Sequence, residues 1–460
     1  MNLALLGLSL YVLAQLAIGV WVSRRIRTEE DFFVAGRRVG PLLAGASIFA
    51  TWFGAETCIG AAGQTYTEGV GSHTVEPFAY GVCLLLSGLL FAAPLWRRKI
   101  VTLADLFRTR YSPVVERVAA ILLVPSSVLW AAAQIYAFAH VLDSTSMHIE
   151  HDEGLAIAAI VVIVYTVFGG LLADIYTDVV QAGTLVVGLV VVAFVCWGEL
   201  ASSGGVLAAV ERSSELRAAT VPPPSAWYAV LEGWSVPNFG SIVAQELISR
   251  TVAARSEGIA RAAGIGGGLA YLVVGLLPVL LGLVGPVLAP GLDDGELLLP
   301  SLAREHLHGV LFVLFAGALV SAILSTADST LLVASSLVAR NLVDRPSFDE
   351  RTRLRVARGG VVVFGLAAWG LSSFAESIYD LLEAASAFAS SGIFVIVTFG
   401  LFTKRGGTAS ALAALVLGVL VWTIGTLAGW SMPYLASLAA ALVGFLVFAG
   451  GRAPAVTASS

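Results

Sequence analysis

The chain alternates between long apolar stretches and short polar connections over its whole length. Most stretches reach the roughly 20 residues that an α-helix needs to cross the hydrocarbon core of a bilayer. The pattern predicts about 13 membrane-spanning helices, and the division at Ala173–Thr177 is the least distinct because the connection is so short. The predicted spans are residues 3–22, 40–64, 75–96, 113–142, 154–173, 177–198, 228–248, 262–288, 308–338, 355–375, 379–402, 407–428 and 432–450.

Composition supports a location in the lipid bilayer. Of the 460 residues, 58% are hydrophobic and 12% are charged, whereas a soluble domain is about one quarter charged. We therefore predict an all-α integral membrane protein. The apolar stretches leave no segment for a soluble catalytic domain, and the sequence carries no nucleotide-binding or catalytic motif. We accordingly expect neither an enzyme nor a protein that binds nucleic acid.

Basic residues gather in alternate loops, which predicts the orientation. The loops after the first, third, seventh, ninth and eleventh spans carry most of them, including Arg24, Arg25, Arg97, Arg98, Lys99, Arg250, Arg255, Arg340, Lys404 and Arg405. The loops on the opposite side carry only Arg212, Arg217 and Arg304. Because basic loops stay in the cytoplasm, we expect a multi-pass protein of the cell membrane. Its N-terminus would lie outside and its C-terminus in the cytoplasm, which requires an odd number of spans.

Two of the predicted spans contain residues that interrupt a helix. The span 40–64 has several glycines around the polar residues Thr51, Glu56 and Thr57, and the span 228–248 has a Pro-Asn-Phe-Gly-Ser segment at 237–241. Irregular backbone at membrane depth is tolerated where it is buried in protein or lines a cavity, although glycine also allows close helix packing. The two interruptions lie five spans apart, as expected for two halves related by an inverted repeat.

A hydroxyl-rich patch at residues 321–329 lies inside the apolar span 308–338. Polar groups at membrane depth are costly unless they face a partner, a cavity or an ion. Ser325 and Thr326 offer two adjacent oxygens without a full charge, and oxygen ligands are what small hard cations such as sodium prefer. The alternative is that these hydroxyls bond to their own helix or join neighbouring helices.

Six motifs are spread along nearly the whole chain: DFFVAGR at 31–37, ATWFGAE at 50–56, YTVFGGL at 165–171, YTDVVQ at 176–181, RTVAARS at 250–256 and SAILSTADS at 321–329. Together they resemble the sodium:solute symporter family. The resemblance implies a LeuT-type fold, with a core of ten helices in two inverted repeats of five. On this basis residues 1–460 form one transporter domain. An extra helix at 3–22 precedes the repeats at 40–198 and 228–402, and two helices at 407–450 follow them.

The same resemblance implies a sodium site and no other cofactor. The matching positions are backbone carbonyls of Ala50, Phe53 and Ala322 and the side chains of Ser325 and Thr326. Asp178 matches an acid that forms part of a second ion site or of a gate. The alternative for Asp178 is an acid early in a helix, where the macrodipole favours a negative charge.

Residues at positions that resemble the family's solute pocket are Trp52, Glu56, Thr57, Glu76, Tyr80, Trp130, Gln134 and Gln245. Trp52 and Trp130 match tryptophans of the choline-transporter branch, where rings hold a quaternary ammonium through cation–π interactions. A third tryptophan of that branch corresponds here to Ala244. For Glu76, the alternative to a solute contact is a solvated acid at the outer membrane boundary. Glu246 precedes Arg250 by four residues, so we expect a surface ion pair there.

These observations predict a sodium-coupled secondary active symporter that imports a small polar solute by alternating access. With Glu246 as a third candidate acid beside Glu56 and Glu76, three candidate acids and two tryptophans favour a cationic or zwitterionic amine or amino acid. Uptake of a sugar or carboxylate is the alternative, and a channel or transporter-like sensor is the alternative from another class. The partners are the sodium ion, the solute and the bilayer. The sequence leaves open the identity of the solute, the sodium stoichiometry, replacement of sodium by protons and the oligomeric state.

Overall fold

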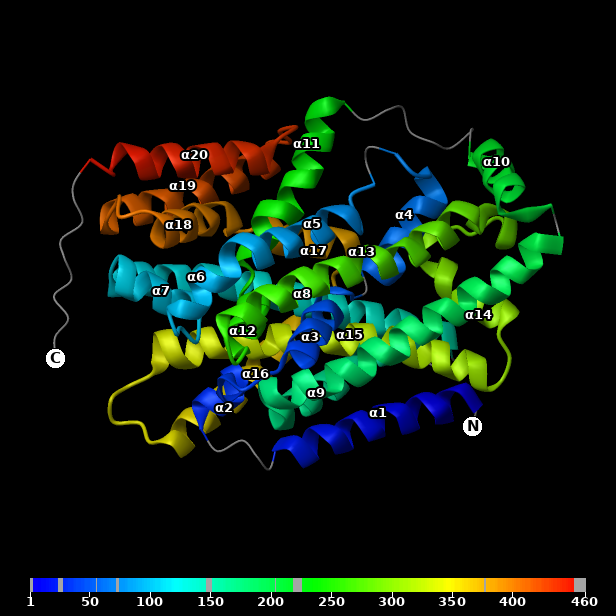
Figure 1. The fold of residues 1–460 in the computed structure, drawn as a ribbon, viewed down its shortest axis with the longest axis horizontal. Coiled ribbons are helices and arrows are strands. Elements are labelled where there is room, and N and C mark those ends of the chain that lie inside the picture. The colour runs from blue at the N-terminus through cyan, green and yellow to red at the C-terminus, as the bar shows by residue number, and fades with distance from the viewer. Residues whose placement is uncertain are drawn as a thin grey trace.

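The computed structural model describes residues 3–23, 28–54, 56–71, 74–145, 151–202, 204–217, 226–375 and 378–450. Within these ranges, eight helical segments are long and apolar enough to cross a membrane, and the bent pair α3–α4 makes a ninth. Many of the helices run close to the long axis of the molecule (Figure 1). The prediction of an all-α integral membrane protein is therefore confirmed.

The chain forms the following helices, apart from short 3-10 and π turns: α1 (Leu3–Ser23), α2 (Glu29–Val34), α3 (Pro41–Trp52), α4 (Ala61–Glu68), α5 (Phe78–Leu86), α6 (Ala92–Arg97), α7 (Leu103–Arg110), α8 (Pro113–Thr145), α9 (His151–Ser202), α10 (Gly205–Arg217), α11 (Trp227–Ser235), α12 (Gln245–Ala253), α13 (Glu257–Leu288), α14 (Leu298–His306), α15 (Val310–Ser336), α16 (Glu350–Ser372), α17 (Ile378–Ala387), α18 (Ser390–Phe402), α19 (Thr408–Leu427) and α20 (Pro433–Val447).

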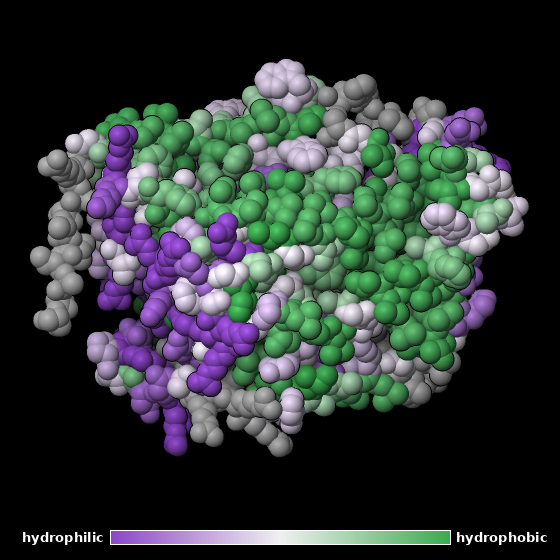
Figure 2. Space-filling model, in the orientation of Figure 1, coloured by the Kyte–Doolittle hydropathy of each residue, from purple (hydrophilic) through white to green (hydrophobic). Residues whose placement is uncertain are grey.

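The surface has the distribution expected of a membrane protein. Hydrophobic side chains cover the middle of the molecule, and hydrophilic side chains gather toward its ends, most of them at the left end where α2 and α7 lie (Figure 2). Helix α1 begins near the right end and α20 ends at the left end (Figure 1). The start of the first described helix and the end of the last thus lie at opposite ends of the molecule.

Helix α9 is broken at Gly170, where φ is 60° and ψ is 171°. Glycine adopts such a backbone conformation readily because it has no Cβ. The hydroxyls of Tyr165 and Thr177 are hydrogen-bonded to each other, although twelve residues of straight helix would separate them by about 18 Å. The chain therefore folds back at Gly170. The predicted boundary between two spans at Ala173–Thr177 was wrong, because the break lies at Gly170. Asp174 and Asp178 therefore lie one turn apart on the same face of one helix.

Both predicted helix interruptions are confirmed. Helix α3 ends at Trp52, and the segment Glu56–Glu68 that contains α4 continues at an angle of 58° to it. Helix α11 ends at Ser235 and is followed by a π turn at Val236–Gly240 and a 3-10 turn at Ser241–Val243. Ala244 is extended, with ψ of 131°, before α12 begins. Helix α15 packs against α8, α9 and α3 and faces the first interruption.

The glycines Gly88 and Gly264 allow α13 to approach the turn between α5 and α6. A Cβ on Gly88 would lie 2.7 Å from the amide nitrogen of Ile265 and 2.9 Å from the carbonyl carbon of Gly264. Because backbone atoms cannot rotate away, we expect Gly88→Ala to cost about 1–3 kcal/mol of stability and to lower the thermal midpoint in detergent. Gly266→Ala is the control, since its Cβ would meet nothing within 4 Å. Equal midpoints for the two variants would contradict this account of the packing.

Candidate functional site

The hydroxyl-rich patch of α15 joins two other helices. Residues 321–329 are all buried. The Ser325 hydroxyl donates to Oδ1 of Asp178 on α9 at 2.5 Å, and the Thr326 hydroxyl donates to the backbone carbonyl of Thr51 on α3 at 2.7 Å. Thr326 also bonds to the carbonyl of Ala322 at 3.2 Å. Ser325 and Thr326 thus each bond to another helix, and Thr326 also bonds within α15.

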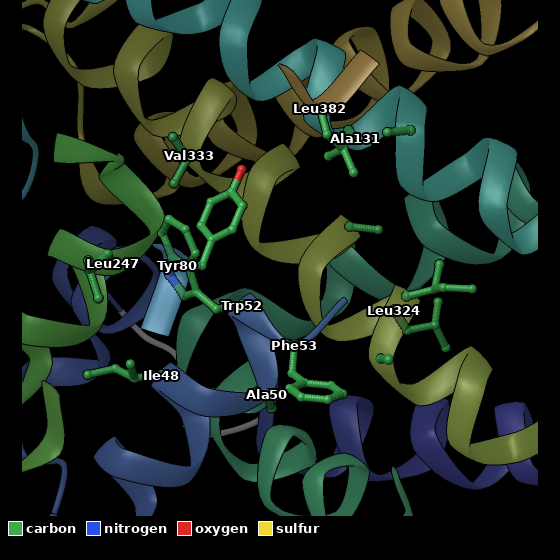
Figure 3. Packing of buried hydrophobic residues seen from close by; sticks show 14 of the residues in the cluster. Ile48, Ala50, Trp52, Phe53, Tyr80, Ala131, Leu247, Leu324, Val333 and Leu382 are labelled. Atoms are coloured by element: carbon green, nitrogen blue, oxygen red, sulfur yellow. The ribbon is translucent and has the colours of Figure 1, made fainter. Parts of the chain in front are cut away.

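The end of α3 brings backbone carbonyls to the same place. The last carbonyls of an α-helix lack partners within the helix, and the bond from Thr326 to Thr51 reaches this set of groups. Figure 3 shows Ala50 and Phe53 beside the part of α15 that carries Leu324. The structure therefore brings the residues of the sequence-derived ion site into one region, where the first interrupted helix crosses α15.

A buried ionic network adjoins this crossing. Arg250 on α12 donates to Oδ2 of Asp174 at 2.6 Å and to Oδ2 of Asp178 at 3.2 Å. It also donates to the hydroxyls of Ser329 at 2.6 Å and Ser47 at 2.9 Å. The Arg250 side chain is 1% exposed. Because Asp178 also accepts from Ser47 and Ser325, the network connects α3, α9, α12 and α15.

This network corrects two sequence-based interpretations. Asp178 lies more than one turn beyond the break at Gly170, and the macrodipole effect is confined to the first turn, so helix position does not account for this acid. The expected surface pair between Arg250 and Glu246 was also wrong. The side chain of Arg250 turns to Asp174 and Asp178 instead, and Asp174 was missed because the predicted helix boundary separated it from Asp178.

Glu246 is a buried residue in the first turn of α12 and is 8% exposed. Its Oε1 accepts from the Ser127 hydroxyl of α8 at 3.1 Å. Arg250 reaches only the backbone carbonyl of Glu246, at 3.5 Å. From the sequence, Glu246 was a candidate for the pocket, but its spacing from Arg250 favoured a surface ion pair. The geometry of the preceding interruption, which the sequence does not show, decides which residues of α12 point inward.

The predicted pocket acids lie in the interior as well. Oε1 of Glu76 accepts from the hydroxyls of Thr57 at 3.0 Å and Tyr271 at 2.6 Å. Glu76 is 4% exposed, so the alternative of a solvated boundary acid was wrong. Glu56 is buried and lies within hydrogen-bonding reach of Tyr80. Tyr271 was missed, although a lone hydroxyl-bearing ring in an otherwise apolar span was a usable signal.

Three aromatic residues from three helices form a cluster. The ring centroids of Trp52 and Tyr80 lie 5.5 Å apart, those of Trp52 and Trp130 lie 5.8 Å apart, and those of Tyr80 and Trp130 lie 6.5 Å apart. Figure 3 shows Trp52 and Tyr80 side by side. Nε1 of Trp52 is buried and has no hydrogen-bond partner. Such rings can bind an organic cation through their faces.

Two further predicted residues have different surroundings. Oε1 of Gln134 lies 3.3 Å from the position that a Cβ on Gly54 would occupy, so Gln134 faces the first interruption. Oε1 of Gln245 accepts from the amide of Leu103 at 2.5 Å, and its Nε2 donates to the carbonyl of Val101 at 3.3 Å. These bonds use both ends of the Gln245 amide to hold α12 against the start of α7.

Two cavities share the residues Trp130, Ala244 and Glu246. The larger lies between α8, the second interruption and the α17–α18 connection, and Ser126, Ser127, Ser241, Ser386 and Ser390 are among its lining residues. The smaller is lined by Thr51, Trp52, Trp130, Ala244, Glu246, Thr326 and Thr330. The smaller cavity therefore connects the aromatic cluster to the crossing of α3 and α15.

The buried charges are strongly unbalanced. Among the described residues, the buried acids are Glu56, Glu76, Glu116, Asp174, Asp178, Glu232, Glu246 and Asp328, and the buried bases are Arg217 and Arg250. Glu116 has Asn341 and Arg108 as partners. Glu232 accepts from the backbone amides of Tyr434 and Leu435. An uncompensated buried carboxylate is costly. The interior is thus suited to cations.

Comparison with known proteins agrees with this chemistry. The model of the sodium:solute symporter family matches residues 32–418. The human high affinity choline transporter 1 is 29% identical over 447 residues, covering 91% of this chain and 76% of that protein. The osmoregulated proline transporter of Bacillus subtilis is 26% identical, covering 91% and 88%. The sodium/glucose cotransporter of Vibrio parahaemolyticus is 24% identical, covering 89% and 82%.

Solved structures show the same fold. A Na+-coupled sialic acid symporter in a substrate-bound outward-open state superposes with a TM-score of 0.85 at 18% identity, covering 98% of this chain and 97% of that one. A nucleobase-cation-symport-1 family transporter in a closed conformation gives 0.63 at 14% identity, covering 91% and 93%. These matches confirm the predicted LeuT-type fold. The chain belongs to the sodium:solute symporter family and is a sodium-coupled symporter of a small solute, not an enzyme.

Proposed function

We propose that this symporter imports a small amine that carries a positive charge, either as a cation or within a zwitterion. The excess of buried acids over buried bases carries the proposal. A carboxylate solute would add negative charge to a pocket that already holds Glu56 and Glu76, and a sugar would leave both acids uncompensated. The cluster of Trp52, Tyr80 and Trp130 supplies ring faces suited to an ammonium group.

We infer that sodium binds where α3 crosses α15. Its ligands would be the carbonyls of Ala50, Phe53 and Ala322 and the hydroxyls of Ser325 and Thr326. The bond between Thr326 and the Thr51 carbonyl supports this inference, because it holds a hydroxyl of one helix at the free carbonyls of the other. Asp178, bonded to Ser325, would add negative charge beside the ion and serve a second ion site or a gate.

The geometry offers a route for coupling. Thr51 and Trp52 are adjacent in sequence and line one cavity with Thr326. Sodium between α3 and α15 would therefore fix one wall of the solute pocket, so that each ligand raises the affinity for the other. We assign the two inverted repeats to residues 40–198 and 228–402, and we place the basic loops in the cytoplasm and the N-terminus outside. The positions of the two interruptions and of the chain ends support this arrangement.

Purified protein in proteoliposomes tests the proposed function. The solutes are radiolabelled choline, proline, glucose and a short carboxylate, each with an inward sodium gradient or an equal potassium gradient. Choline is the solute named for the human relative, and proline represents a zwitterion. We expect accumulation of choline or proline with sodium only. Accumulation of glucose or the carboxylate, with neither amine taken up, would overturn the proposal.

Glu76→Gln tests the pocket charge. Glutamine keeps the volume and an acceptor oxygen for Thr57 and Tyr271, so the main change is the loss of the negative charge. We expect KM for the transported amine from the outer side to rise by roughly 30-fold or more, as for loss of one partner of a buried charge pair. Glu305→Gln, at an exposed position on α14, is the control. An unchanged KM in Glu76→Gln would remove this acid from the solute site.

A further inference from the structure

Among the described helices that are long and apolar enough to cross a membrane, α16 is the least enclosed by protein. Only 22% of its apolar segment is buried, whereas the other long apolar helices are 33–72% buried. One face of α16 packs against α8, α9 and α15. The contact with α15 is close, because a Cβ on Gly360 would lie 2.7 Å from Oγ of Ser335. The opposite face of α16 is therefore open to the surrounding lipid.

Three arginines form a stripe at the start of this open face. Arg351, Arg355 and Arg358 are separated by four and three residues, so they lie on one side of the helix within about 60° of each other. Arg351 and Arg355 are exposed, and Arg358 is half-buried. Within the described part of the chain, none of the three forms an ion pair. Nε of Arg358 is buried without a hydrogen-bond partner, so the binding capacity of this guanidinium is not used up.

The acids of the same segment do not cancel the charge of the stripe. Arg353 lies on another side of α16 and pairs with Asp344 at 2.9 Å and with Glu350 at 3.5 Å. Asp349 caps the helix, where its Oδ1 accepts from the amide of Thr352 at 2.9 Å. Residues 344–358 contain five arginines and three acids. The segment therefore keeps an excess of positive charge.

An apolar surface continues the stripe along the helix. Val362, Leu366 and Trp369 follow Arg358 at spacings of four, four and three residues and are exposed. Arg358 and Trp369 are about 16 Å apart along the helix axis, which is close to half of the roughly 30 Å hydrocarbon core. Beside the stripe, a Cβ on Gly359 would meet nothing within 4 Å. One line on the helix thus offers guanidinium groups and then apolar surface as long as one leaflet is thick.

This order of charge and apolar surface fits a lipid. Guanidinium groups bind phosphate through two parallel hydrogen bonds, and basic clusters beside a membrane-spanning helix attract anionic headgroups. A soluble anion or an acidic protein would contact the arginines and leave the apolar part of the stripe unused. Helix α16 begins near α2, at the end of the molecule where hydrophilic side chains gather (Figures 1 and 2). The leaflet concerned is therefore the one on the side of the basic loops.

We propose that the stripe of Arg351, Arg355 and Arg358, continued by Val362 and Leu366, binds an anionic phospholipid of this leaflet. The phosphate pairs with the guanidinium groups, and an acyl chain lies along the apolar part of the stripe. Because the other face of α16 packs against α15, the bound lipid holds α16 against the helix of the hydroxyl-rich patch. The site depends neither on the solute nor on sodium, so it goes beyond the proposed function.

Thermal midpoints of the purified protein in detergent, in potassium buffer without sodium or solute, test the lipid site. The additives are dioleoyl phosphatidylglycerol, dioleoyl phosphatidylcholine and inorganic phosphate. We expect a saturable rise of about 3 °C or more with phosphatidylglycerol alone. The triple variant Arg351→Gln, Arg355→Gln, Arg358→Gln should need roughly tenfold or more phosphatidylglycerol for half of the shift. The double variant that keeps Arg358 should need roughly threefold more, and it serves if loss of Arg358 disturbs folding.

The matched control is the triple variant Arg98→Gln, Arg261→Gln, Arg405→Gln. It removes the same charge from exposed positions next to α6, on α13 and after α18, and it should respond to phosphatidylglycerol as wild type does. An equal loss in this control would show a general effect of basic charge and overturn the site on α16. The proposal also fails if phosphatidylcholine or phosphate alone gives the full shift, if wild type shows no saturable shift, or if the α16 variants respond like wild type.

Discussion

Replacing Ser325 and Thr326 together by alanine is expected to abolish the stabilisation that sodium gives to the purified protein. The two hydroxyls supply two of the five proposed oxygen ligands, so their removal would leave the cation with three protein oxygens. At a sodium concentration 100 times Kd, binding contributes about 2.7 kcal/mol to the native state. The Ser325→Ala, Thr326→Ala double variant should lose this sodium-dependent stabilisation. Thermal midpoints in sodium chloride and in potassium chloride of equal ionic strength measure the difference.

Ser336→Ala is the matched control for the double variant. Ser336 is a buried serine of the same helix, and its hydroxyl bonds to the carbonyl of Val333 within α15. It should keep the full sodium-dependent shift. Sodium-driven uptake should be lost in the double variant and kept in the control. A double variant that sodium stabilises as strongly as it stabilises wild type would show that the ion binds elsewhere.

Replacing Arg250 by methionine is expected to lower stability more than any other single change considered for this protein. The guanidinium compensates Asp174 and Asp178 in a site that is almost fully buried. Removing one partner of a buried ion pair typically costs about 3–5 kcal/mol, because the remaining charge stays buried without compensation. Arg250→Lys should also be destabilising, since an ammonium cannot reproduce the planar fork that reaches both acids and two serines.

The measurement is the thermal midpoint and the monodisperse yield in detergent. Arg97→Ala is the control, because the pair of Arg97 and Glu257 is exposed and should not affect the midpoint measurably. Adding Asp174→Asn and Asp178→Asn to Arg250→Met should recover much of the lost stability, because the two acids that pair with Arg250 are then neutral and only Asp328 remains as a buried acid nearby. A midpoint for Arg250→Met equal to that of wild type would contradict a structural role of the network.

The residues that mark the candidate site were largely accessible to sequence reasoning. Glycine or proline occurs together with polar residues at two places in the apolar stretches, so the two breaks after Trp52 and Ser235 could be predicted. A serine and a threonine in the middle of α15 were visible for the same reason, since polar groups stand out against an apolar background. Trp52 and Trp130 were identified through their resemblance to family positions, and the structure places their rings 5.8 Å apart.

The partners of these residues were much less accessible. Asp174 was missed because one glycine at 170 determines where α9 turns back. Arg250 was paired with Glu246 by helical spacing, yet it bonds across the bundle to α9. Tyr271 and Ser127 acquire their importance only from helices that are distant in sequence. In each case the missing information was which helix faces which.

The sequence alone determined that this is a membrane protein of long apolar helices, where two of those helices break, and which polar residues lie at membrane depth. It did so because each property depends on the local chain and on the cost of polar groups in lipid. Tertiary structure decided which acids share Arg250, that Glu76 is buried, and that Glu246 faces a cavity. Lipid-facing and protein-facing surfaces of a membrane helix are both apolar, so hydrophobicity could not tell which side of each helix turns inward.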